Sequence, residues 1–318
     1  MNREDLLTRL HALAAEPIPL PGSGDTARRH EMLMNAGRED LSLARLVEAH
    51  WDAVAILAEA GRKPEDGAIY GVWASEMPGR PLRLEKQGDK FTVSGEKMFC
   101  SGAGLIDRVL VTVTEPNHQL VDIDLRVHAS AVHFDHADWK SCAFAETQTS
   151  KAIFESVPCR RESIVGESRW YLDRPGFWHG ACGPAACWAG GAAGILDYAM
   201  RQGRDDSHTL AHLGAMYASV WAMQALLHSA GQEIDQDPLS VFKARVRARV
   251  LRHLVEISST DILRRLARAY GPHPLAMDEN MSRRYQELDL YLRQCHAERD
   301  LEALGRDLKS CGSPRLQL

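Results

Sequence analysis

The stretch Gly71–Gly104 reads GVWASEMPGRPLRLEKQGDKFTVSGEKMFCSGAG. Two short, mainly apolar runs, Ile69–Ala74 and Lys97–Cys100, are each followed by a serine, Ser75 and Ser101 respectively. Between the runs, alternating apolar and polar residues are interrupted by a Gly-Asp pair, which is a strand–turn–strand pattern. The sequence therefore predicts a small antiparallel sheet in which two strand ends carry the serines to one edge. Such an edge suits a flat heterocycle with polar groups, whereas the alternative is an ordinary pair of hairpins.

Three pieces of the sequence resemble the middle domain of the acyl-CoA dehydrogenase family. Val72–Glu76 is similar to a family strand that ends in (Thr/Ser)-Glu, and Val93–Ala103 is similar to its Gly-x-Lys-x-Trp-x-Thr-x-Ala stretch. Phe154–Pro158, followed by Ile164–Gly166, resembles the end of that domain, and the spacing between the pieces also fits. The resemblance implies FAD as the cofactor, with its isoalloxazine ring lined by Trp73, Ala74, Ser75, Phe99 and Ser101.

Two features depart from the family pattern. Where the family has Gly-Ser-Asp after the first glutamate, this chain has Pro78-Gly79-Arg80-Pro81, so the usual acyl-CoA contacts of that loop have no counterpart. The N-terminal helical region is also shorter than the family usually carries. Its loss of helices would open one side of the flavin and substrate cleft, unless a partner subunit covers it.

The composition is that of a soluble globular protein of two or three domains. The chain has 318 residues, 45% of them hydrophobic and 25% charged, and a formal net charge of −5. This balance argues against a nucleic-acid partner, and no apolar run approaches the roughly 18 residues of a membrane span. The scattered cysteines, without a Cys-x-x-Cys pair, and the lack of a secretory signal predict a cytoplasmic protein.

The order of segments predicts an α+β fold in three parts. Helical patterns over 1–16 and Asp25–Ala60, the latter divided at Gly37, form a short N-terminal part, residues 1–66. Strand patterns fill residues 67–167, and a helical bundle fills residues 168–318. The long helical stretches of this bundle are Gly183–Met200, Thr209–Gly231, Pro238–Arg268 and Met281–Leu308. The first is rich in small residues, which permit close helix–helix or helix–cofactor approach. The resemblance implies the family architecture of N-terminal helices, a central antiparallel β-barrel or sheet domain and a C-terminal bundle.

The catalytic base of the family has no counterpart. The family reaction removes a proton beside a thioester carbonyl and passes a hydride to flavin, so it needs a carboxylate. The corresponding run here, Leu290–Gln294, has Leu292 or Arg293 at that position, and neither accepts a proton at ordinary pH. A second family location, on the first C-terminal helix, reads Ala185-Ala186-Cys187. The sequence therefore does not predict ordinary α,β-dehydrogenation.

Candidate substitutes for the base lie just beyond this run. Glu298 is the nearest carboxylate, and His296 is a second candidate, as a base or as a ligand of an oxygen intermediate. The alternative for both is an exposed helix with paired side chains four residues apart. Arg293 is a candidate partner for an anionic group of the substrate.

Only part of the family's motif for binding the phosphates of FAD is present in this sequence. Family members use Arg-x-x-Phe-Gly for the pyrophosphate, whereas this chain keeps only the arginine, Arg204, as a candidate. On the adenine side, the run Tyr270–Pro274 keeps one glycine of the family's Gly-Gly-x-Gly. FAD is the predicted cofactor, with FMN or weakly held FAD as the alternatives.

The predicted function is a flavin-dependent oxidoreductase that acts on an acyl-CoA or a related small acyl substrate without the usual glutamate. By resemblance, the C-terminal helices build a homodimer or homotetramer. The alternative is a catalytically silent relative of the fold that acts as a binding or assembly partner. No metal site is predicted, because His133 and Asp135 share one strand face and His136 lies on the other. Cys182 and Cys187, among small apolar residues, favour unreactive buried thiols.

Overall fold

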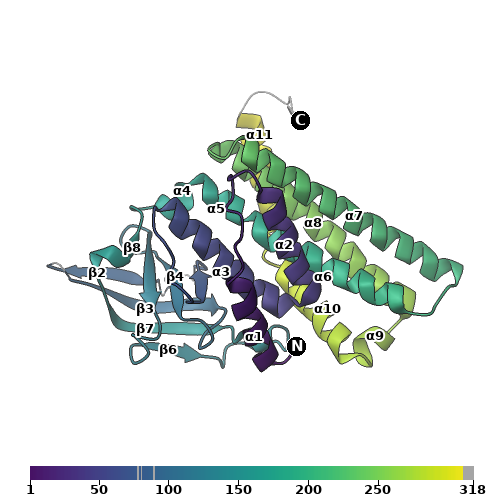
Figure 1. Ribbon diagram of the computed structural model, residues 1–318, viewed down its shortest axis with the longest axis horizontal. Coiled ribbons are helices and arrows are strands. Elements are labelled where there is room, and N and C mark those ends of the chain that lie inside the picture. Colours follow the sequence, from purple (N-terminus) through teal and green to yellow (C-terminus); the bar gives the residue numbers. More distant parts are fainter. Residues whose placement is uncertain (77–78, 80, 89, 311–318) are drawn as a thin grey trace. The chain divides into compact units, whose positions relative to one another are not determined.

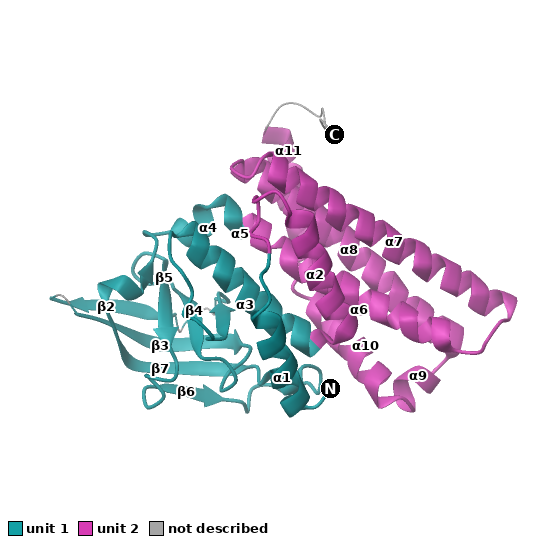
Figure 2. Cartoon of the chain, in the orientation of Figure 1, with its two compact units in different colours: residues 1–18, 42–177 teal, residues 19–41, 178–318 magenta. Residues whose placement is uncertain are grey.

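The computed structural model describes residues 1–76, 79, 81–88 and 90–310. Pro78 and Arg80 of the loop that departs from the family pattern, and the Asp89 of the Gly-Asp turn, lie outside the described residues. The chain divides into two compact units, residues 1–18 with 42–177 and residues 19–41 with 178–318 (Figure 2). The three-part division at residues 66 and 167 stays a prediction.

The first unit holds both β-sheets together with α1 and α3 (Figure 1). Its helices are α1 (Arg3–Ala14), α3 (Leu41–Glu59) and α4 (Trp170–Asp173), with 3₁₀ turns η1 (Ala145–Thr147) and η2 (Arg161–Ser163), and α5 (Pro175–Gly180) continues into the second unit. Its strands are β1 (Tyr70–Trp73), β2 (Arg83–Gln87), β3 (Lys90–Cys100), β4 (Arg108–Val113), β5 (Gln119–Asp124), β6 (Val132–Asp135), β7 (Ser150–Cys159) and β8 (Ile164–Val165).

Within the described residues, the strands form two four-stranded sheets, in the orders β1-β4-β5-β8 and β2-β3-β7-β6. β1 pairs in parallel with β4, from Tyr70 beside Arg108 to Trp73 beside Val111, whereas β3 pairs antiparallel with β2 and β7. The prediction that β1 and β3 belong to one antiparallel sheet is therefore wrong. Three of the four residues of β1 are buried, and such a continuous apolar run, covered on both faces, is typical of a parallel strand.

The helix α3 supplies one wall of the core of the first unit. Its apolar residues recur every three or four positions, so one face of the helix packs on the first sheet and on α4. The buried members of this cluster are Ala53, Ile56, Leu57, Ala68, Tyr70, Leu110, Leu120, Val165 and Tyr171. This packing gives the end of β1 a rigid support.

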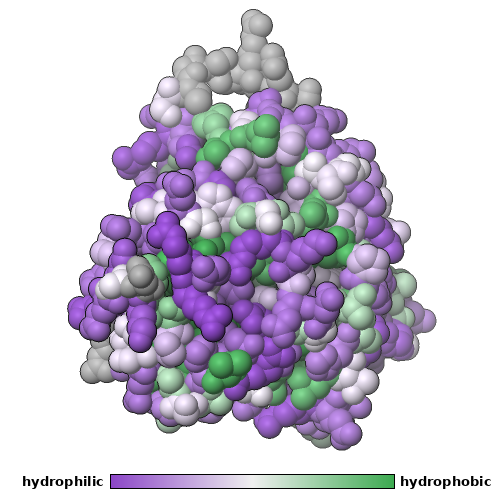
Figure 3. Space-filling view, turned by 60° about the vertical axis from the view of Figure 1, so that its left-hand side comes forward, coloured by the Kyte–Doolittle hydropathy of each residue, from purple (hydrophilic) through white to green (hydrophobic). Residues whose placement is uncertain are grey.

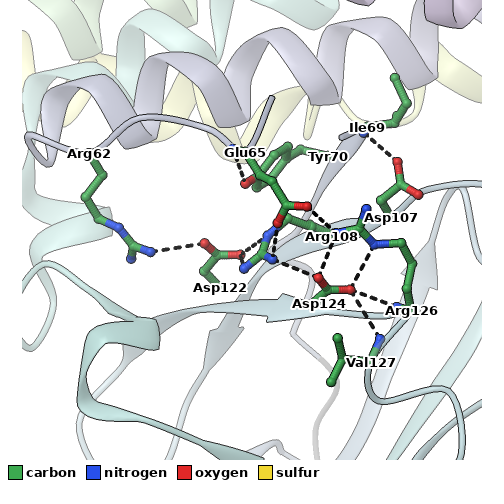
Figure 4. Close-up of polar contacts among 10 residues, drawn as sticks. All are labelled: Arg62, Glu65, Ile69, Tyr70, Asp107, Arg108, Asp122, Asp124, Arg126 and Val127. Carbon is green, nitrogen blue, oxygen red and sulfur yellow. Dashed lines mark hydrogen bonds and ion pairs between the residues drawn. The ribbon is translucent and has the colours of Figure 1, made fainter. Parts of the chain in front are cut away.

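An ion-pair network ties the segment after α3 to β4 and β5 (Figure 4). Its charged members are Arg62, Arg108, Arg126, Glu65, Asp122 and Asp124. The guanidinium of Arg108 lies 3.0 Å from Asp122 and 2.9 Å from Asp124. Burial raises the pKa of Asp122, while the hydrogen bond from Arg126 lowers that of Asp124 to about 2. Because arginines and carboxylates balance, the network fits a structural role better than the binding of a charged ligand.

The second unit is helical. Its helices are α2 (Thr26–Glu39), α6 (Cys182–Arg201), α7 (Ser207–Gln236), α8 (Val241–Tyr270), α9 (His273–Ala276), α10 (Glu279–Leu292) and α11 (Glu298–Ser310). The break after α2 falls at Asp40, whose backbone is extended, and the predicted break at Gly37 is wrong. The predicted stretch Met281–Leu308 is two helices, because Ala297 between them has a left-handed backbone with a φ of 46°.

Gly190 of α6 and Gly37 of α2 lie where these two helices touch. A Cβ atom added to Gly190 would lie 2.0 Å from the carbonyl oxygen of Met34, and one added to Gly37 would lie 2.3 Å from that of Cys187. The two helix backbones therefore approach as closely as only glycine allows. The small residues of α6, for which the sequence leaves helix–helix and helix–cofactor approach open, make a helix–helix contact here.

Each unit has a buried histidine whose ring is hydrogen-bonded to the backbone. The ring of His50 accepts a hydrogen bond from the Tyr70 N–H at 3.1 Å, and the ring of His30 donates one to the Leu227 carbonyl at 2.9 Å. Burial lowers the pKa of each histidine to about 4. The unfolded chain, with a histidine pKa of about 6.5, therefore binds protons that the folded chain excludes.

We expect the free energy of unfolding to fall as the pH drops from about 6.5 to about 4, by roughly 3 kcal/mol for each of the two histidines. Urea unfolding at about pH 7, 5.5 and 4.5 measures this slope. The His50→Asn variant should lose part of it, whereas His208→Asn, at an exposed position, should keep it. The same slope in His50→Asn as in the wild type would contradict this explanation.

Candidate functional site

The ends of β1 and β3 dock on each other within the first unit. The indole N–H of Trp73, the last residue of β1, donates to the carbonyl oxygen of Ser101 at 3.0 Å. The hydroxyl of Ser75 donates to the carbonyl oxygen of Met98 on β3. The two serine-bearing strand ends therefore lie together, although their strands belong to different sheets.

The carboxylate of Glu76 ties the end of β1 to both sheets. The Nζ of Lys97 lies 3.3 Å from Glu76 Oε1 and donates to the Thr112 hydroxyl at 2.9 Å. The hydroxyls of Thr112 and Thr114 donate to the same carboxylate. Burial lowers the pKa of Lys97. Burial also acts to raise the pKa of Glu76, but the hydrogen bond from Thr114 and the charge of Lys97 outweigh it and lower that pKa. This cluster locks the two strand ends together.

A row of hydroxyl groups runs inward from Ser101. Arg45 Nε on α3 donates to Ser101 Oγ at 2.7 Å, and Ser101 Oγ lies 2.9 Å from Thr149 Oγ1. Thr149 Oγ1 lies 2.8 Å from Thr147 Oγ1, and the Thr147 hydroxyl donates to the Phe144 carbonyl at 2.8 Å. The Arg45 guanidinium also lies 5.1 Å from the centre of the Phe144 ring. The sequence gives no local signal for Arg45, Thr147 or Thr149, because only the fold brings α3 and η1 to the end of β3.

Three non-glycine residues around this row have a left-handed backbone. The φ angles are 59° at Phe99, 61° at Phe144 and 49° at Gln148. Each such residue costs on the order of 1 to 2 kcal/mol, and such residues concentrate at functional sites. Phe99 also has 60% of its surface exposed. An exposed aromatic ring beside fixed hydroxyls is a suitable surface for a planar ligand.

Of the five residues predicted to line the flavin ring, four lie at the surface and one is buried beneath them. Ala74, Ser75 and Ser101 are half-buried and Phe99 is exposed, and we call these four residues the strand-tip surface. Trp73 is only 2% exposed, and its indole packs edge-on against two phenylalanine rings of the second sheet. Its side chain therefore supports the surface from within the core.

The other two predicted site residues lie in the second unit. Arg204 donates to the carbonyl oxygen of Ala269 at 2.9 Å and to Asp206 at 3.0 Å, so its guanidinium is engaged inside the unit. Glu298 is exposed at the start of α11. The segment before α11 is bonded to Arg252, about 25 Å along α8 from Ala269 at a rise of 1.5 Å per residue. The structure does not bring Arg204 and Glu298 together.

The sequence resemblance sets Leu292 and Arg293 at the position of the family's base. Leu292 is fully buried. Arg293 forms ion pairs with one carboxylate of α8, at 3.5 Å, and one of α10, at 3.7 Å. His296 lies 3.4 Å from Asp300 in the next helix. Burial raises the pKa of the Cys182 thiol to about 11, which agrees with an unreactive buried cysteine.

Within the described residues, no group of three or more histidine, cysteine or carboxylate side chains is placed to hold a metal ion. His133 lies 3.4 Å from the carboxylate of Glu155 across the neighbouring strand.

No family model matches the sequence, and a search of curated proteins gives no match. Several solved structures share its fold. KijD3, in complex with FMN and dTDP-3-amino-2,3,6-trideoxy-4-keto-3-methyl-D-glucose, has a TM-score of 0.77 and 13% identity over 99% of this chain and 86% of its own. TdsC of Paenibacillus sp. A11-2, a dibenzothiophene monooxygenase, has in its complex with FMN and indole a TM-score of 0.75 and 16% identity over 87% and 81%. Butyryl-CoA dehydrogenase of Megasphaera elsdenii has a TM-score of 0.73 and 14% identity over 96% and 97%. At these identities the likeness establishes a shared fold.

Proposed function

The chain has the acyl-CoA dehydrogenase fold, as its sequence predicts, and on that premise we propose that it is a flavin-dependent oxidoreductase that holds its cofactor ring at the strand-tip surface. The observation that carries the proposal is the docking of β1 on β3, which gathers Ser75, Phe99 and Ser101 within that fold. A bound flavin would supply the redox chemistry, while the protein supplies binding, orientation and electrostatics.

The side chains of the strand-tip surface fit a flavin ring by their chemistry. An isoalloxazine has an apolar benzenoid edge and a polar pyrimidine edge. Ala74 and Phe99 offer apolar contact, and Ser75 and Ser101 offer polar contact. The hydroxyl of Ser101 is already fixed by Arg45, so little ordering is needed when a ring binds.

The base position favours oxygen insertion over α,β-dehydrogenation. Leu292 is aliphatic and buried, and the Arg293 guanidinium is paired with a carboxylate and has donors but no acceptor, so neither removes a proton from a substrate carbon. TdsC, which shares the fold, is a monooxygenase. We therefore place the reaction among the flavin-dependent oxygenations of small molecules. The acyl-CoA or acyl substrate that the sequence resemblance predicts is the alternative.

FAD is the flavin predicted by the sequence resemblance, and FMN is its competitor. The guanidinium of Arg204, predicted to bind the pyrophosphate, is held by Ala269 and Asp206. FMN has no pyrophosphate and therefore does not need this residue. The FMN in the TdsC and KijD3 complexes supports the same choice.

Anaerobic titration of the purified protein with FMN and FAD, each oxidised and reduced, tests the proposal. We expect binding, seen as shifted flavin absorbance bands and quenched tryptophan fluorescence, with FMN bound more tightly than FAD. Tighter binding of FAD would restore Arg204 as the pyrophosphate contact. A protein that binds neither flavin in either redox state would contradict the proposal and favour a catalytically silent binding or assembly partner.

Glu298 remains the candidate catalytic carboxylate. Glu298→Gln keeps the size of the side chain and removes its basicity, so we expect turnover to drop at least about 100-fold with the fold intact. Glu302→Gln, on the same exposed helix, is the control and should keep full activity. Full activity in Glu298→Gln would assign this residue to the solvated surface of α11.

We propose that α7 joins copies of the chain in a cytoplasmic homodimer or homotetramer. The helix carries no charged residue between Asp206 and Glu233, and it exposes 52% of Leu210, 62% of Tyr217 and 64% of Trp221. Although the sequence predicts no membrane span, α7 is by length and composition the one described helix that could cross a membrane, and 22% of its most apolar window is buried. By contrast, the face in Figure 3 is mainly hydrophilic, with small separate hydrophobic groups.

A second copy of the chain would cover the exposed apolar side chains of α7. Light scattering of detergent-free protein tests this, and a monomer would contradict it.

A further inference from the structure

We propose that Thr147 and Thr149 fix the hydroxyl of Ser101 as a hydrogen-bond acceptor, so that the strand-tip surface binds a reduced flavin ring in preference to an oxidised one. The inference rests on the proposed function, because it concerns the same surface. It states that the Ser101 hydroxyl accepts a hydrogen bond from the ring and that the site therefore prefers reduced flavin.

The direction of the hydroxyl row follows from counting hydrogens, because each hydroxyl has one to donate. The Thr147 hydroxyl donates its hydrogen to the Phe144 carbonyl oxygen, which can only accept. In the contact between Thr147 and Thr149, the donor is therefore Thr149. In the contact between Thr149 and Ser101, the donor is therefore Ser101.

Arg45 closes the other end of the row. Its Nε–H donates to Ser101 at 2.7 Å, and a guanidinium has no lone pair with which to accept. Thr147 is 0% exposed and Thr149 is 3% exposed, so water offers these hydroxyls no other partner. Reversing any one of these bonds would leave two oxygen atoms 2.8 or 2.9 Å apart with no hydrogen between them. Ser101 therefore presents one acceptor site, and no hydrogen, to the strand-tip surface.

An acceptor that faces N5 distinguishes the two redox states of a flavin, and the proposal includes that N5 of the bound ring faces Ser101. The N5 atom of the reduced ring carries a hydrogen and donates, whereas N5 of the oxidised ring has only a lone pair. A reduced ring whose N5 meets Ser101 gains a hydrogen bond, and an oxidised ring meets a second lone pair. One net hydrogen bond corresponds to a ratio of about 3- to 10-fold in affinity.

The test compares the wild type with Thr149→Val, which removes the acceptor of the Ser101 hydrogen with little change of shape, and with Thr149→Ser, which keeps a hydroxyl. Dissociation constants of oxidised and reduced FMN are measured anaerobically for each protein, and circular dichroism checks the fold. We expect the oxidised-to-reduced ratio of dissociation constants to fall about 3- to 10-fold in Thr149→Val, because the released Ser101 hydrogen can turn to the oxidised ring. Thr149→Ser should keep the wild-type ratio. A tenfold fall lowers the two-electron midpoint potential of bound FMN by about 30 mV.

An unchanged ratio in folded Thr149→Val overturns the inference and leaves the proposed function standing. Should Thr149→Val fail to fold, Ser101→Ala replaces it. This variant removes the acceptor itself, so the same ratio must fall, and an unchanged ratio again overturns the inference. A wild-type protein that binds neither form of FMN nor of FAD overturns both proposals.

Discussion

Glu76→Gln is expected to lower the free energy of unfolding by about 3 kcal/mol. The reason lies in Lys97, whose side chain is only 2% exposed and whose Nζ lies 3.3 Å from the Glu76 carboxylate. Removing that carboxylate leaves an ammonium group buried without a counter-charge. Urea unfolding at neutral pH measures the loss. We also expect weaker flavin binding, because the ends of β1 and β3 lose the contact that locks them together.

Lys97→Met is the matched control at the same ion pair. It should cost about 1 kcal/mol or less, because the Glu76 side chain is 46% exposed and keeps its hydrogen bonds from Thr112 and Thr114. The buried Lys97 therefore needs Glu76 as its counter-charge, whereas the partly exposed Glu76 is less dependent on Lys97. Equal losses in the two variants would contradict this description of the pair.

The difference between wild type and Glu76→Gln should also depend on pH. Although burial acts to raise it, the pKa of Glu76 is lowered by Thr114 and Lys97. Its contribution to stability is therefore present above the unfolded pKa of about 4.3 and is lost as the pH falls through the folded pKa. The two proteins should converge in acid, and a difference that persists there would argue against the ion pair as its cause.

Gly190→Ala is expected to destabilise the second unit by about 3 kcal/mol or more. The added Cβ atom would lie 2.0 Å from the carbonyl oxygen of Met34 and 2.8 Å from the backbone nitrogen of Arg38. Both are backbone atoms of α2, so relief requires the helix itself to move. Without a steric clash, alanine in place of glycine stabilises a helix by about 1 kcal/mol. A loss of stability in Gly190→Ala would therefore indicate the close contact between α2 and α6.

Gly214→Ala is the matched control, on α7. No atom lies within 4 Å of a Cβ atom added there, so this variant should gain up to about 1 kcal/mol. Thermal and urea unfolding of both variants give the comparison. If Gly190→Ala proved as stable as Gly214→Ala, the close approach of α2 and α6 would be wrong.

Segments with a strong local pattern can be predicted from this sequence, whereas their partners cannot. The helices α6, α7 and α8 lie where apolar and small residues place them, because helical spacing is a local property. The apolar run of β1 marks a buried strand, yet its parallel partner is β4 rather than β3. Pairing depends on contacts between distant segments, which no local pattern records.

The candidate site follows the same rule. Ser75 and Ser101 can be found because each follows an apolar run that ends at the docked strand ends. Arg45 and Thr149 cannot, because only tertiary packing brings them to Ser101. Arg204 shows the converse, since a suitable residue type in a suitable order turns out to be bonded within its own unit. Residue type indicates a role only after the fold has placed the side chain.

Anaerobic titration of the wild type, Ser101→Ala and Ser94→Ala with reduced FMN shows whether the strand-tip surface binds a flavin ring. Ser94 lies earlier on the same strand, away from its docked end, and serves as the control. We expect the wild type to bind reduced FMN, Ser101→Ala to bind it about 3- to 10-fold more weakly, and Ser94→Ala to match the wild type. No binding by the wild type, or equal binding by the wild type and Ser101→Ala, would contradict a flavin ring at the strand-tip surface.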